Sequence, residues 1–179
     1  MNLSREQSGV ALGMGFALAL TIAGFALPLV WSPFPDLPPS SDQRFALWAT
    51  ASVPIAFIVV VAIARLARYR FFSADDIHGG ASNSATANAR RLQAMLQNTL
   101  EQAFLAVVAY GVWIALSDVR LGVLPALFAL YFSAGRILFF RGYAGGAAAR
   151  ALGFALTFYP SASLIVAATL VALARLFST

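Results

Sequence analysis

Five runs of apolar residues follow one another along the chain, and each is about long enough to cross a membrane as a helix. They cover roughly residues 9–31, 45–67, 95–117, 122–140 and 151–177. About 20 helical residues cross a hydrocarbon core about 30 Å thick, and a helix satisfies its own backbone hydrogen bonds in lipid. The runs therefore predict an all-α integral membrane protein with five spans.

The composition excludes a soluble domain of this size. Of 179 residues, 60% are hydrophobic and 11% are charged, and the mean hydropathy is +0.79. With so little polar sequence outside the runs, we expect one membrane bundle and the lipid bilayer as its surroundings. The chain has no cysteine, which excludes disulfides, cysteine metal sites and a cysteine nucleophile.

The first apolar run follows Arg5 and could be mistaken for a secretion signal. The apolar part of a signal peptide is typically about 7–15 residues long and precedes a small-x-small cleavage site. The run over residues 9–31 is longer, and it lacks a clean cleavage site of this kind before Pro28. We therefore expect this run to be retained as the first span.

The arginines predict the orientation of the spans. All 12 basic residues are arginine, against 7 acidic residues, and cytoplasmic loops of membrane proteins are enriched in such residues. Five spans would place nine arginines on one side and three on the other, so we expect a multi-pass protein of a bacterial inner membrane with a cytoplasmic N-terminus. The arginines lie in several short segments, which argues against a nucleic-acid surface. The first side holds Arg5, Arg65, Arg68, Arg70, Arg90, Arg91, Arg136, Arg141 and Arg150, and the second holds Arg44, Arg120 and Arg175.

A polar segment, "QNTLEQ" at residues 97–102, interrupts the third run. Helical spacing places Arg91, Asn98 and Glu101 on one face. An ionised side chain in the middle of a span costs about 2.5–3.5 kcal/mol on insertion scales, so Glu101 should have a partner. Arg136 in the next span lies at a similar depth. A purely structural interpretation is an Arg136–Glu101 pair that is hydrogen-bonded through Asn98.

A second motif follows the fourth run. Arg136, Tyr143 and Arg150 are seven residues apart within "RILFFRGYAGGAAAR", and they would form one stripe if the helix continued through the glycines. A guanidinium group pairs with carboxylates and can stabilise a thiolate. The alternative for Arg150 is an ordinary cytoplasmic anchor at the end of a span.

These two motifs resemble those of the MAPEG family, the membrane-associated proteins in eicosanoid and glutathione metabolism, and in particular the microsomal glutathione transferases. The resemblance covers about residues 45–177, and residues 1–44 have no counterpart. It implies an antiparallel four-helix transmembrane domain at residues 45–179. It leaves residues 1–44 as an additional N-terminal transmembrane helix and loop.

The resemblance also implies a function. Members of the family form homotrimers and bind glutathione as a cosubstrate between neighbouring subunits, near the cytoplasmic face. Their hydrophobic, electrophilic substrates reach the thiol from the bilayer. In this chain Arg150 matches the catalytic arginine that stabilises the thiolate. Asn98, Glu101, Arg136 and Tyr143 match glutathione-binding positions, and Arg91 could assist them.

Three departures from the family pattern keep a second interpretation open. Ala94, Phe139 and Gln102 stand where family members often carry donors or an aromatic residue. They favour a non-catalytic binding or scaffold protein with the family fold.

Two further interpretations are weaker. A transporter that uses Glu101 as a proton carrier would be expected to show broken spans and an internal repeat. We expect no metal site, because Asp75, Asp76 and His78 lie in a polar loop without a suitably spaced fourth ligand.

Overall fold

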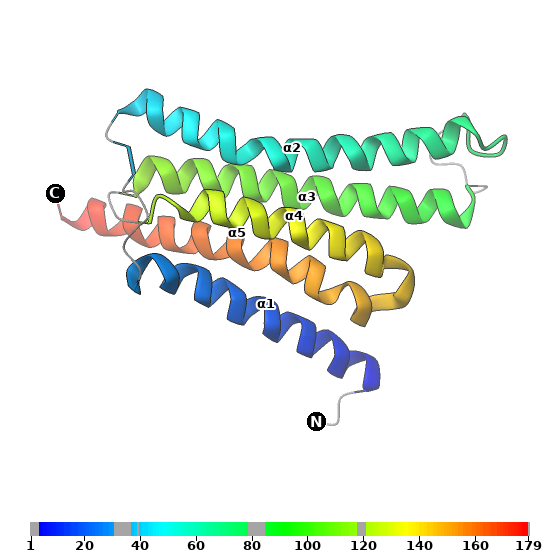
Figure 1. The fold of residues 1–179 in the computed structure, drawn as a ribbon, viewed down its shortest axis with the longest axis horizontal. Coiled ribbons are helices and arrows are strands. Elements are labelled where there is room, and N and C mark those ends of the chain that lie inside the picture. The colour runs from blue at the N-terminus through cyan, green and yellow to red at the C-terminus, as the bar shows by residue number, and fades with distance from the viewer. Residues whose placement is uncertain (1–3, 31–36, 39, 79–84, 118–120, 179) are drawn as a thin grey trace.

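The computed structural model describes residues 4–30, 37–38, 40–78, 85–117 and 121–178. Each predicted run coincides with a helix, except at three run ends: Ser117, Gly122 and Val123 lie just outside α3 and α4, and Trp31 lies outside the described residues. The helices extend past the runs because their polar ends stay helical. Ser40 caps the second helix and Thr86 caps the third. In chain order the elements are α1 (Arg5–Val30), α2 (Ser41–Phe71), α3 (Ala87–Leu116), α4 (Leu124–Gly142), the 3₁₀ turn η1 (Tyr143–Gly145) and α5 (Gly146–Phe177) (Figure 1).

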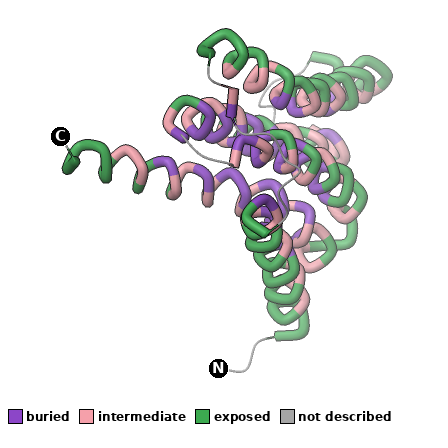
Figure 2. The backbone as a smooth tube through the Cα atoms, turned by 60° about the vertical axis from the view of Figure 1, so that its left-hand side comes forward, coloured by how far each residue is buried: buried purple, intermediate pink, exposed green. Residues whose placement is uncertain are grey.

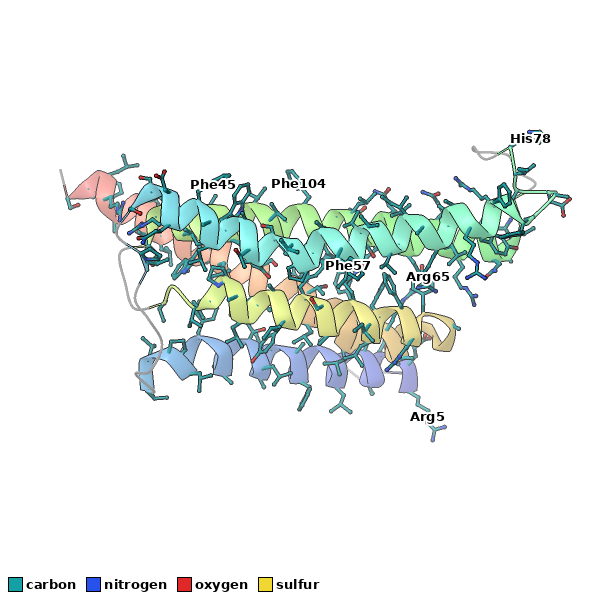
Figure 3. The ribbon with its side chains drawn as sticks, turned by 45° about the horizontal axis from the view of Figure 1, so that its top comes forward. Arg5, Phe45, Phe57, Arg65, His78 and Phe104 are labelled. Atoms are coloured by element: carbon teal, nitrogen blue, oxygen red, sulfur yellow. The ribbon has the colours of Figure 1, made fainter. Side chains whose placement is uncertain are left out.

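The helices are long and apolar enough to span a membrane, which confirms an all-α integral membrane protein. Four stretches qualify, the last of which runs from Leu124 to Phe177 through α4, η1 and α5. The outward faces of the helices are mostly exposed and the facing sides are buried (Figure 2). Phe45 and Phe104 project outward from α2 and α3 (Figure 3). Large exposed apolar side chains of this kind fit contact with lipid.

Consecutive helices run in opposite directions, and α5 lies at the centre of the arrangement (Figure 1). It packs against α1, α3 and α4, while α2 packs mainly against α3. Tyr110, Phe128, Phe132 and Leu164 are among the fully buried side chains of the core. Small residues such as Ala106 fill the spaces between helices, as expected where helices approach closely in a membrane.

The turn between α4 and α5 decides whether the helix continues through the glycines. The helix does not continue through the glycines, because Gly146 adopts a φ of 88° and the chain reverses there after η1. A side chain at this backbone conformation would be strained, whereas glycine adopts it freely. Tyr143 and Arg150 therefore do not share a stripe on one helix. They face each other from the two sides of a hairpin.

Two glycines allow α4 and α5 to cross at close range. A methyl group on Gly153 would lie 2.6 Å from the carbonyl oxygen of Gly135 and 2.8 Å from Cα of Phe139. A methyl group on Gly135 would lie 2.9 Å from the carbonyl oxygen of Gly153. The backbones of the two helices thus meet next to Arg136.

A carboxylate, that of Asp76, hydrogen-bonds to residues at both ends of the segment between α2 and α3. Asp76 Oδ1 accepts a hydrogen bond from the backbone N–H of Thr86 at 3.0 Å, and its Oδ2 accepts from the hydroxyls of Thr86 and Ser73, each at 2.7 Å. These donors, the Thr86 backbone first, hold the pKa of Asp76 below its ordinary value. Asp75 and His78 are exposed. Asp76 therefore ties the first residues of α3 to the end of α2.

Candidate functional site

A cavity of about 390 Å³ lies between α1, α3 and the α4–α5 hairpin. Three of the six predicted site residues line it, namely Asn98, Tyr143 and Arg150. Polar groups thus meet an otherwise apolar wall, which is the usual character of a small-molecule site. The rest of the lining consists of Val10, Met14, Phe139, Ala147, Ala151 and Phe154.

Arg150 is placed by the start of α5 and held by an aromatic ring. Its guanidinium carbon lies 4.5 Å from the centre of the Tyr143 ring, within the range of a cation–π interaction. The Tyr143 ring in turn packs edge-on against Phe139 at 5.3 Å. The contact with the ring leaves the edges of the guanidinium group available as hydrogen-bond donors. The arrangement can therefore present a fixed positive charge to an anionic ligand.

Arg136 is placed differently from the prediction. It is 0% exposed and does not line the cavity. One guanidinium nitrogen donates to Asn98 Oδ1 at 2.9 Å, and another donates to Thr157 Oγ1 at 2.6 Å. Its guanidinium carbon also lies 4.4 Å from the centre of the Phe139 ring. Arg136 thus joins α3, α4 and α5, and it contacts the cavity lining through Asn98 and Phe139.

The proposed Arg136–Glu101 pair is not what the structure shows. Glu101 is exposed on α3, and its Oε1 accepts a hydrogen bond from Gln97 Nε2 at 3.0 Å. The rotation of α3 turns Asn98 towards α4 and leaves Glu101 on the outer face. Asn98 alone therefore forms the side-chain contact of the polar segment with Arg136.

Arg91 lies at a separate place. Its guanidinium group donates to Asn88 Oδ1 at 2.6 Å, and it lines a second cavity of about 550 Å³ between the ends of α2 and α3. Arg65 and Arg68 line the same cavity. Arg65 is drawn in Figure 3 towards the end of the bundle that carries Arg5 and His78. Arg91 and Glu101 are therefore apart from the first cavity within this single chain.

Some residues of the site region were not predicted. Thr157 accepts the second side-chain hydrogen bond of Arg136, and its hydroxyl also donates to the Phe154 carbonyl oxygen at 2.7 Å. The only sequence signal for Thr157 is a hydroxyl side chain inside an apolar span. Ser133 and Thr169 give the same signal but do not bond to Arg136. Val10 and Met14 gave no signal, because α1 is apolar around its whole circumference. Their place in the cavity follows from tertiary packing alone.

Comparison with known families tests the resemblance. A model of the MAPEG family matches residues 45–170. The chain belongs to the MAPEG family. The match contains Asn98, Tyr143 and Arg150, but it begins after α1, so the MAPEG region supplies only part of the cavity lining. Searches of curated proteins and of solved structures give no match.

Proposed function

We propose that this MAPEG protein is a membrane-embedded glutathione-dependent transferase or peroxidase, of the microsomal glutathione transferase type, that acts on hydrophobic electrophiles. The observation that carries the proposal is the meeting of Asn98, Tyr143 and Arg150 in one cavity that is otherwise apolar. Peptide-binding groups, a fixed cation and a lipophilic wall are the three features that such a reaction needs.

The chemistry follows from the properties of a thiol. A free thiol has a pKa of about 8.5. A neighbouring guanidinium group lowers this pKa and so raises the fraction of reactive thiolate. Arg150 would hold this charge beside the sulfur of glutathione, while the Asn98 amide and the Tyr143 hydroxyl would bind the peptide. The thiolate then attacks the electrophilic carbon, a carbon–sulfur bond forms, and the leaving group departs with its electron pair.

We further propose a homotrimer in a bacterial inner membrane with a cytoplasmic N-terminus. Glu101 lies halfway along α3 and is exposed in the single chain. Contact between lipid and an ionised carboxylate at this position would cost free energy. A second copy of the chain packed on this face would cover Glu101, and it would bring Glu101 and Arg91 closer to a neighbouring cavity. The MAPEG-like domain would then occupy residues 45–179, and residues 1–44 would be the addition.

Arg136 supports a second candidate, a non-catalytic MAPEG protein. This residue is fully buried and bonded to two other helices, so part of the predicted glutathione site serves to hold the bundle together. In that case the family fold would persist without binding glutathione.

Ligand binding separates the two candidates. The purified protein should unfold at a higher temperature in millimolar glutathione and in S-hexyl glutathione, but not in a thiol without the peptide, because a ligand of the folded state stabilises it by mass action. The absence of any shift would favour the non-catalytic candidate.

Turnover then tests the role of the cation. Arg150→Ala should abolish most conjugation of glutathione to a hydrophobic electrophile. Arg141→Ala is the matched control, because Arg141 is exposed near the same hairpin and does not line the cavity. Equal conjugation rates for the wild type and Arg150→Ala would refute the proposed catalytic role.

A further inference from the structure

Helix α1 lies directly against the start of α5, and two glycines make this possible. A methyl group on Gly9 would lie 2.8 Å from Cβ of Ala148, and one on Gly13 would lie 2.9 Å from the backbone nitrogen of Leu152. Gly15, by contrast, has nothing within 4 Å. Gly9 and Gly13 therefore mark the packed face of α1, and Gly15 marks a face without protein contact.

The position of α1 is supported by charge as well as by shape. The Glu6 carboxylate oxygen lies 3.6 Å from the Cβ position of Gly146, the first residue of α5. Free backbone N–H groups give a helix N-terminus partial positive charge, which favours a nearby carboxylate. The first turns of α1 are therefore fixed at the hairpin that carries Arg150.

This packing brings α1 to the cavity. Val10 and Met14 are four residues apart on one helical face, next to the two packed glycines, and both line the cavity together with Arg150. Met14 is 39% exposed, so it stands at the edge of the cavity rather than in its floor. A methionine side chain is flexible and adapts to apolar ligands of different shape.

We infer that α1 is a specificity-determining wall of this cavity: Val10 and Met14 select, by length and width, the apolar molecules that reach Arg150. The proposed function supplies the chemical class of these molecules, which are hydrophobic electrophiles. The wall itself depends only on the packing of α1. A larger residue at position 14 narrows the cavity, and a smaller one widens it.

Because the chain has no cysteine, a single introduced thiol can measure access without any glutathione. Ala147 lines the cavity and is half-buried, so Ala147→Cys places the reporter inside. Its rate of modification is measured with a small methanethiosulfonate and with a bulky aromatic maleimide, in detergent. Adding Met14→Ala should raise the rate with the bulky reagent by about tenfold, and adding Met14→Trp should lower it, while the small reagent changes little.

A paired glycine experiment tests the packing of α1. Gly13→Ile should separate α1 from α5 and raise the rate with the bulky reagent. Gly15→Ile introduces the same side chain on the face without contacts and should leave the rate unchanged. The inference is refuted if the labelling rates do not change from those of the parent Ala147→Cys protein in any of three variants, namely Met14→Ala, Met14→Trp and Gly13→Ile.

A second arm uses S-alkyl glutathiones of increasing chain length in thermal unfolding. Met14→Trp should remove the stabilisation by long-chain conjugates and keep that by S-methyl glutathione. If the thiol reporter responds to Met14 and no conjugate binds the wild type, the wall is supported and the glutathione function fails. If the conjugates bind and neither arm responds to Met14, the function is supported and the wall is refuted.

Discussion

Among single residues, Arg136 shows how a predicted ligand-binding residue can also hold the helices of a bundle together. The sequence identified it correctly as a cation that needs partners inside a span. It named Asn98 as one partner but wrongly added Glu101, because the rotation of α3 about its axis decides which of the two faces α4. Thr157 was beyond prediction for the same reason, since its face depends on where α5 turns after Gly146.

Removal of the Thr157 hydroxyl should destabilise the protein. In Thr157→Val the buried guanidinium loses an acceptor that lies 2.6 Å away, and an unpaired hydrogen bond of a charged group costs about 1.5–3 kcal/mol. Chemical unfolding in detergent measures the change. Thr169→Val is the control, because the Thr169 hydroxyl also bonds to its own helix, at 2.8 Å, but is exposed. Equal stability of the two variants would show that the bond to Arg136 contributes nothing.

The Asp76 carboxylate should make the α2–α3 loop sensitive to acid. Its pKa in the folded protein is lowered by the donors from Thr86 and Ser73. The stabilisation is therefore complete above the unfolded pKa of about 3.8, and it is lost as the pH falls through the lower folded pKa. The difference in unfolding temperature between the wild type and Asp76→Asn should be largest near neutral pH and should shrink at acidic pH. A constant difference across this range would contradict the titration of Asp76.

At the scale of the helices, the apolar runs predicted where the spans lie along the chain. They did not predict how closely two spans approach each other. Gly135 and Gly153 are separated by a turn in the chain, and nothing in either run shows that they meet. A break between the last two spans was predicted, but its position at Gly146 was not, because alanines and glycines are compatible with a helix. Local sequence thus predicts where helices lie, whereas their contacts depend on the packing of the whole bundle.

The α4–α5 crossing should not tolerate a side chain. In Gly153→Ala the new methyl group would meet backbone atoms of Gly135 and Phe139, which cannot rotate away. Overpacking of this kind costs about 1–3 kcal/mol. Thermal unfolding of Gly153→Ala should show this loss, and Gly15→Ala should be at least as stable as the wild type, because alanine favours the helix more than glycine does. A fully stable Gly153→Ala protein would mean that the two helices can separate at no cost.

In the whole molecule, the uneven distribution of arginines predicts which end is cytoplasmic. Arg5, Arg65 and His78 lie towards one end of the bundle, and Phe45 lies towards the other (Figure 3). Arg120, which was counted on the arginine-poor side, lies outside the described residues. The direction of insertion depends on this charge bias, which no contact between helices reveals.

Single cysteines can test the orientation in cells. Ala74→Cys lies in the exposed loop after α2, and Ser178→Cys lies beyond the end of α5. In intact cells of a bacterial host, a membrane-impermeant maleimide should label Ser178→Cys, and it should reach Ala74→Cys only after the membrane is permeabilised. The reverse labelling pattern would place the arginine-rich end outside.

The buried bonds of Arg136 also constrain the order of events during synthesis. When α4 leaves the ribosome, Asn98 on α3 has already been made, but Thr157 on α5 has not. An arginine inside a span opposes partition from the translocon into lipid by about 2.5–3.5 kcal/mol. α4 has only 19 residues, so the favourable transfer free energy of its apolar side chains offsets little of this cost. We therefore expect α5, which brings the second hydrogen-bond partner of Arg136, to aid the stable integration of α4.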